Sequence, residues 1–221
     1  MNIFDAADAP SRLARYTLLG QRAASGAVQH VALLALDTEG WRAGDAVKVI
    51  EVAPPLRLGT PGWTHRVPHV LAWIDLTAAE REAIDFWVHD LHQRRKVNAA
   101  IGRDRWDDFV LVPPRLPSVE PTRFSCAGLV WSAYADSDAA IELVDLDSLP
   151  PLRRDELTEI CGFLDDPALS SRLADFGLGE GDAWPVLLPG YLFHAVRTFR
   201  RGAPSYRPAA RDSVWPACAT P

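Results

Sequence analysis

The sequence predicts a single α+β domain in which an antiparallel sheet packs against helices. Two segments with strand-type patterning, 28–36 and 46–52, flank a turn at 37–40 and predict an antiparallel pair with a long connection. A capping box from Thr77 to Glu80 begins a long amphipathic helix. No internal repeat or linker divides the chain, so these elements are expected to form one domain.

The first half of the chain supplies the expected sheet. Residues 9–24 predict a helix that Gly26 ends, because apolar residues recur along it. These are Leu13, Tyr16, Leu18 and Leu19. Strands are expected at 28–36, 46–52, 67–76 and 107–112. The capping-box helix extends to about residue 95, and its buried stripe comprises Ile84, Trp87, Val88 and Leu91.

A second buried helix begins at Cys126. A proline-rich loop precedes it, Ser125 is placed to cap it, and apolar residues then repeat at helical spacing. Those residues are Leu129, Val130, Ala133 and Tyr134. The thiol therefore lies in the first turn, where unpaired N–H groups and the helix dipole lower a cysteine pKa. The same pattern also fits a small cysteine that is merely packed in a buried helix.

The last third of the chain predicts helices and carries no recognisable chemistry. A short strand is expected at 141–144, with helices at 153–164, at 168–176 (ended by Gly177) and near 191–197. We predict one domain over 1–200, with its core at about 26–145 and a helical extension at 146–200. The Pro-, Ala- and Arg-rich tail at 201–221 is expected to be extended or loosely ordered.

Composition argues against several classes of function. The 221 residues are 48% hydrophobic and 24% charged, with a net charge of −6 that does not suit a nucleic-acid partner. No apolar run reaches the roughly 18–20 residues of a membrane span, and the N-terminus lacks a signal-peptide pattern, so a cytoplasmic protein is expected unless a dedicated secretion system exports it. Three dispersed cysteines, without CxxC or HExxH spacing, predict no disulfide framework, metal or organic cofactor.

Two polar residues stand out within apolar strands. His30 enters the most apolar strand, and Glu51 lies between Ile50 and Val52 in the next. Pairing of the two strands would let the carboxylate fix the tautomer of the imidazole and stabilise the imidazolium. The alternative for His30 is a histidine satisfied by a backbone carbonyl at the end of the strand.

These segments, in this order, resemble the circularly permuted NlpC-type branch of the papain-like cysteine hydrolases, whose relatives include lecithin retinol acyltransferase-like enzymes. His30 to Leu33 is similar to the histidine strand of that family, Ile50 to Val52 to the second strand, and Cys126 to Val130 to the cysteine helix. The segment 102–107 is similar to the family's Gly-x-x-Tyr-Asp segment. The resemblance covers about residues 26–145. It implies a papain-like fold with the nucleophile at a helix N-terminus.

The resemblance also implies roles for individual residues. Cys126 is the expected nucleophile, His30 the general base and then acid, and Glu51 the orienting residue. Two departures concern the substrate pocket: Ala127 replaces the common serine after the cysteine, and Trp106 replaces a tyrosine. The candidate substrate-binding residues are Trp63, Trp106 and Ser125, although large aromatic residues also commonly fill cores.

The predicted function is cleavage of an amide, ester or thioester bond through a cysteine thioester, on a lipid or small amide substrate. Two alternatives remain. One is a peptidoglycan or peptide amidase of the same fold, such as a secreted toxin. The other is a non-enzymatic module that binds a fatty acyl ligand. The oligomeric state is left open.

Overall fold

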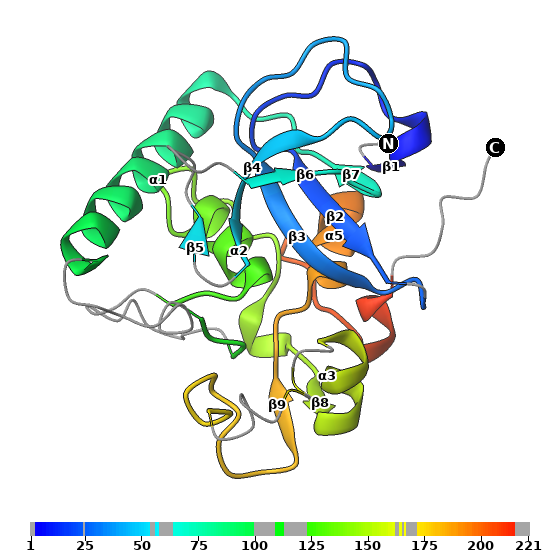
Figure 1. Ribbon diagram of the computed structural model, residues 1–221, viewed down its shortest axis with the longest axis vertical. Helices are drawn as coiled ribbons and strands as arrows, with labels where there is room; N and C mark the ends of the chain where they lie inside the picture. Colours follow the sequence, from blue (N-terminus) through cyan, green and yellow to red (C-terminus); the bar gives the residue numbers. More distant parts are fainter. Residues whose placement is uncertain are drawn as a thin grey trace.

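The computed structural model describes residues 3–23, 25–53, 56–57, 64–99, 109–112, 123–161, 164, 166 and 172–214. Within this part of the chain, an antiparallel sheet packs against helices (Figure 1), which confirms the predicted α+β class. None of the helices in these ranges is long and apolar enough to cross a membrane.

Seven short strands make up the main sheet. They are β1 (Ile3–Asp5), β2 (Leu18–Arg22), β3 (Val28–Leu34), β4 (Val47–Val52), β5 (Leu56–Arg57), β6 (Thr64–Arg66) and β7 (Val70–Ala72). Their order is β1-β7-β2-β3-β4-β5, and β6 also pairs with β4. The helices are α1 (Ala78–Ala99), α2 (Cys126–Ala135), α3 (Arg154–Ile160) and α5 (Pro189–Thr198). A second, two-stranded sheet joins β8 (Pro151–Arg153) to β9 (Ala183–Pro185), and 3-10 turns span Ala6–Asp8, Leu146–Ser148 and Ala210–Ser213.

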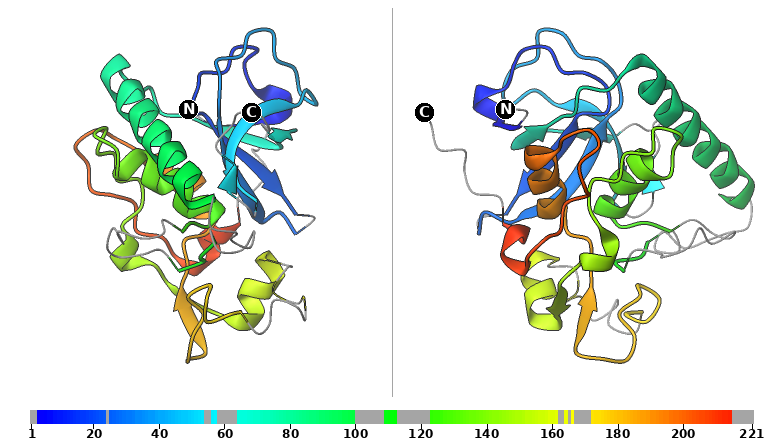
Figure 2. Two further views of the ribbon diagram at one scale, coloured as in Figure 1. Left: turned by 60° about the vertical axis from the view of Figure 1, so that its left-hand side comes forward. Right: turned by 180° about the vertical axis from the view of Figure 1, so that it is seen from behind.

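Alternation along the strands gives the sheet a core on each face. In β3, Val31 and Leu33 belong to the larger core, which also contains the buried residues of α2 and α5. Ala32 and Leu34 belong to a smaller core on the opposite face. In Figure 2, α2 and α5 cover the same face of the sheet. The helix that begins at Cys126 is therefore held against β3 by buried apolar contacts.

The helix predicted at 9–24 is wrong, because its second half is strand β2. Leu18 packs in the larger core and Leu19 in the smaller one, so neighbouring side chains point to opposite faces with the period of a strand. A Cβ at Gly20 would lie 2.6 Å from Cγ1 of Val70, which shows how closely β7 approaches β2 there. Tyr16, just before the strand, has a φ of 69°.

Several other predicted elements agree with the structure. β3 and β4 confirm the strands expected at 28–36 and 46–52, and α5 confirms the last helix. The capping box of α1 is confirmed, since the Thr77 N–H donates to Oε2 of Glu80 at 2.7 Å and the Glu80 N–H donates to Oγ1 of Thr77 at 3.2 Å. The strand expected at 67–76 is shorter, because only β7 pairs.

The C-terminal third differs more from expectation. The strands expected at 107–112 and 141–144 are reduced, over the described residues, to single bridges at Phe109 and Val144. The helix expected at 153–164 is confined to α3, and described residues 172–176 of the helix expected at 168–176 form turns. In the described part of the tail, Tyr206 bridges to Val144, and its hydroxyl donates to Oδ2 of Asp212 at 2.6 Å.

The C-terminal segment passes so close to α5 that only glycine fits at residue 190. A Cβ at Gly190 would lie 2.2 Å from the carbonyl oxygen of Ser213. We expect Gly190→Ala to lower the free energy of unfolding by about 1–3 kcal/mol, as overpacking does, and to lower the melting temperature in calorimetry. Gly179→Ala is the matched control, since nothing lies within 4 Å of a Cβ there. Equal melting temperatures for the two variants would contradict the close contact.

Candidate thiol site

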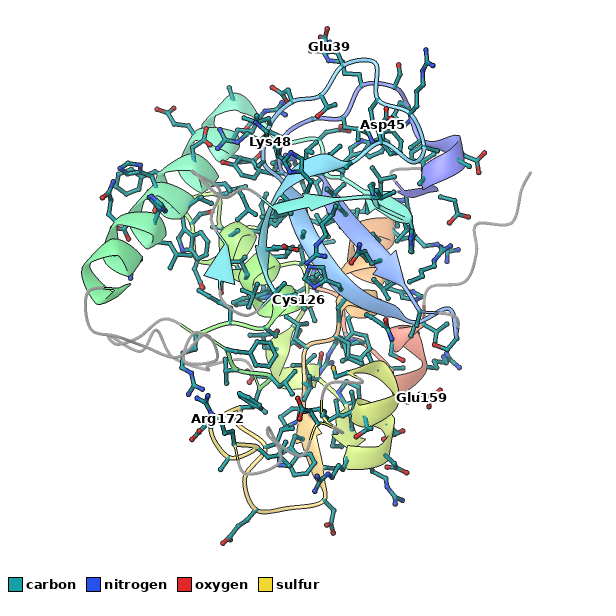
Figure 3. All side chains as sticks on the ribbon, in the orientation of Figure 1. Glu39, Asp45, Lys48, Cys126, Glu159 and Arg172 are labelled. Carbon is teal, nitrogen blue, oxygen red and sulfur yellow. The ribbon has the colours of Figure 1, made fainter. Side chains whose placement is uncertain are left out.

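The start of α2 is defined by its cap. Ser125 has an extended backbone, and its hydroxyl oxygen accepts the N–H of Gly128 at 2.9 Å. Cys126 follows as the first residue of the helix, and its side chain is partly exposed. Figure 3 labels Cys126 near the centre of the fold, where α2 packs against β3.

Strands β3 and β4 stop pairing near Cys126, so the thiol lies against β3 where β4 has separated from it. In the described structure, β3 pairs with β4 only at Leu33↔Ile50 and Leu34↔Val49. Beyond these pairs β4 turns to β5, with Glu51 opposite Arg57. Val31 lies on the part of β3 left unpaired by β4, and its N–H lowers the pKa of the Cys126 thiol. The start of α2 thus packs against β3 where β4 separates from it.

His30 and Glu51 meet at this point, as the strand pattern predicted. Nε2 of His30 lies 2.7 Å from Oε2 of Glu51. The His30 side chain is 17% exposed, whereas that of Glu51 is 0% exposed. The His30 ring also lies close enough to the Cys126 thiol for each group to shift the pKa of the other. Thiol, imidazole and carboxylate therefore lie next to one another in series.

An arginine completes the surroundings of the carboxylate. Nε of Arg66 donates to Oε2 of Glu51 at 2.9 Å, and Nη2 donates to Oε1 at 3.1 Å. Arg66 ends β6, which pairs with β4. Sequence analysis missed this residue, because a single arginine in the short segment 64–66 has no periodicity. The available signal was chemical: a buried glutamate needs a cationic partner.

The pKa values of the three groups follow from these contacts. Burial alone would lower the pKa of His30, but hydrogen bonds to Cys126 and Glu51 outweigh it and raise that pKa to about 9. Burial alone would raise the pKa of Cys126, but the imidazole and the N–H groups of Val31 and Ala127 outweigh it and lower that pKa. Burial likewise opposes ionisation of Glu51, yet His30 and Arg66 lower its pKa to about 2. These contacts shift both groups towards the charged pair, a thiolate beside an imidazolium.

No family model, curated protein or solved structure matches the chain. Chemical arguments about this site therefore rest on its own geometry.

The other predicted site residues have different outcomes. Trp63 and Trp106 lie outside the described residues. Ser125 is 5% exposed, and its hydroxyl is engaged in the helix cap. It borders a cavity of about 10 Å³, which holds roughly one water. Its assignment as a substrate contact stays a prediction.

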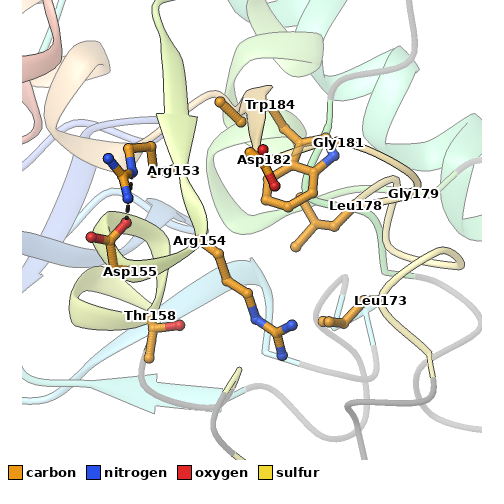
Figure 4. A pocket seen from close by; sticks show the side chains of 11 residues that line it. Arg153, Arg154, Asp155, Thr158, Leu173, Leu178, Gly179, Gly181, Asp182 and Trp184 are labelled. Atoms are coloured by element: carbon orange, nitrogen blue, oxygen red, sulfur yellow. Dashed lines mark ion pairs between the residues drawn. The ribbon is translucent and has the colours of Figure 1, made fainter.

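A larger hollow lies away from the thiol, between α3, the two-stranded sheet and the loop before β9 (Figure 4). Its volume is about 1070 Å³, and it contains none of Cys126, His30 and Glu51. Its charged lining is mixed, and Arg153 pairs with Asp155 at 3.4 Å. Within the described part of the chain, no cluster of three or more His, Cys, Asp or Glu side chains is placed to hold a metal ion.

Proposed function

We propose that the protein is a cysteine hydrolase or acyltransferase that acts on an amide, ester or thioester bond through a Cys126 thioester. The observation that carries the proposal is the series from Cys126 through His30 to the buried Glu51. A thiol at the start of a helix, with a histidine beside it and a carboxylate behind the histidine, has the groups that nucleophilic catalysis requires. The order of the three residues along the chain supports the permuted NlpC-type, papain-like arrangement as part of the same proposal.

Each group has a defined role in the proposed reaction. The Cys126 thiolate attacks the carbonyl carbon, and the N–H of Cys126 contributes to binding of the resulting oxyanion. The His30 imidazolium gives its proton to the leaving group, which departs and leaves the thioester. His30 then takes a proton from water or from an acceptor hydroxyl or amine, which attacks the thioester and releases the thiolate. Glu51 holds the ring in place throughout.

The proposed substrates are acyl lipids or small amides. This preference rests on the absence of any sequence feature that directs the chain to a cell wall. A peptide or peptidoglycan amidase would use the same residues, and a binding module would keep the fold without forming a covalent intermediate.

The experiment that tests the proposal is capture of the acyl-enzyme. We expect a p-nitrophenyl acyl ester to add one acyl group to the protein, at Cys126, and mass spectrometry of the peptide to locate it. Cys126→Ala should lose the adduct, whereas Cys161→Ser should retain it, because burial and the charge of Cys126 raise the pKa of Cys161 to about 12. A chain that binds the ester without forming an adduct would be a binding module, and the hydrolase proposal would fail.

A further inference from the structure

The carboxylate of Glu51 is held from two sides. Its Oε2 accepts both Nε2 of His30 and Nε of Arg66, and its Oε1 accepts Nη2 of Arg66. The side chain is 0% exposed, so water does not replace these donors. We propose that Arg66 is a positioning residue of the thiol site, whose two-point contact fixes the Glu51 carboxylate on His30. This inference deepens the proposed function and rests on it.

A single hydrogen bond from His30 would leave the plane of the Glu51 carboxylate free to turn about Oε2. The planar guanidinium binds both oxygens and sets that plane, which an ammonium group cannot do. Without Arg66, the buried Oε1 of Glu51 would lose its hydrogen-bond donor. An unsatisfied buried acceptor is costly, so Glu51 would tend to move away from the imidazole.

Among the side chains that the structure describes, the ionisable groups around the carboxylate are His30 on β3, Arg66 on β6 and, beyond the imidazole, Cys126 on α2. With a thiolate and an imidazolium, these four groups carry two positive and two negative charges. Removing Arg66 leaves a net negative charge in a site with little solvent, which protonation of the thiolate would relieve.

The fixed carboxylate and the balanced charges both predict that loss of Arg66 shifts the pH dependence of Cys126 reactivity. We expect Arg66→Gln to move the midpoint of the iodoacetamide labelling rate of Cys126 to higher pH by about one unit, the low end of what a neighbouring charge does. Below the midpoint, this shift corresponds to a roughly tenfold slower rate. Arg66→Lys keeps the positive charge but loses the two-point contact, and its midpoint should lie between those of Arg66→Gln and the native protein.

The measurement uses the full chain with Cys161 and Cys218 replaced by serine, and rates are taken from pH 4 to 9. Arg201→Gln is the matched control: Arg201 also contacts both oxygens of a glutamate, Glu80, but that pair belongs to the start of α1. Its midpoint should not move, and circular dichroism establishes that each variant is folded. A control that shifts as far as Arg66→Gln would overturn the inference, because loosening of the fold would then explain both shifts.

The remaining outcomes separate the inference from the proposed function. If Cys126 reacts in a His30-dependent manner but Arg66→Gln leaves the midpoint unchanged, the role of Arg66 is refuted and the proposed function stands. If lysine restores the midpoint completely, charge alone suffices and the two-point contact is refuted. If Arg66→Gln does not fold, Arg66→Lys decides. A labelling midpoint equal to that of the native protein then refutes the role of the two-point contact. If labelling of Cys126 does not depend on His30, the proposed function itself fails.

Discussion

Replacing His30 with alanine is expected to slow the alkylation of Cys126 by iodoacetamide about 100-fold at pH 6. In the native protein the imidazole lowers the pKa of Cys126, so a larger share of the thiol is ionised at this pH than in an unperturbed cysteine. Without the imidazole, burial dominates, the pKa rises above its ordinary value and little thiolate remains. Stopped-time labelling followed by mass spectrometry of the peptides that contain Cys126 and Cys161 measures the rates.

Cys161 provides the internal reference for that experiment. Burial and the negative charge of Cys126 raise the pKa of Cys161 to about 12, so it should react slowly in both proteins. A Cys126 that labels no faster than Cys161, or at the same rate with and without His30, would remove the basis for a catalytic thiol.

Replacing Glu51 with glutamine is expected to lower the free energy of unfolding at pH 7 by about 3 kcal/mol, since one pKa unit corresponds to about 1.36 kcal/mol. The native contacts overcome burial and lower the Glu51 pKa from 4.5 to about 2. A lowered native pKa stabilises the fold above pH 4.5, and this contribution disappears as the pH falls through 2. Urea unfolding between pH 2 and 7 should show a steep acid limb in the native protein and a flatter one in Glu51→Gln.

The matched control for this variant is Glu39→Gln. Glu39 faces Arg12 at 3.9 Å with both side chains about four-fifths exposed, so its loss should change stability by well under 1 kcal/mol.

The alkaline side of the pH profile of stability supplies a second check. The pKa of His30 is raised from 6.5 to about 9, so its stabilisation is complete below pH 6.5 and is lost as the pH rises through 9. Because His30 and Glu51 share one hydrogen bond, the two effects are not additive. An equal acid limb in native protein and Glu51→Gln would contradict the ion pair.

Much of the site could be predicted from sequence because each residue broke a local rule. His30 and Glu51 are polar residues in apolar strands, which requires a compensating partner, and each provides it for the other. The two strands are neighbours that pair at Leu33 and Ile50, and the contact between His30 and Glu51 lies just beyond the last pair.

Other features depended on contacts that no local pattern encodes. The pattern at 18–22 predicts a helix, whereas Leu18 and Leu19 pack in two different cores, which only the covering of both faces of the sheet reveals. Arg66 lies 15 residues from Glu51 along the chain, and nothing around it in sequence distinguishes it from an arginine on the surface. Tyr206 bridges to Val144 and hydrogen-bonds Asp212, contacts that composition does not reveal.

The packing of α2 against β3 determines when the pKa of Cys126 falls during synthesis. Residues 30, 51 and 66 emerge well before residue 126, and the sulfur receives its donors only when α2 has packed against β3. Until these distant parts of the chain meet, Cys126 is an ordinary thiol with an ordinary pKa. The lowered pKa of Cys126 is therefore a property of the completed tertiary structure, and a nascent or unfolded chain lacks it.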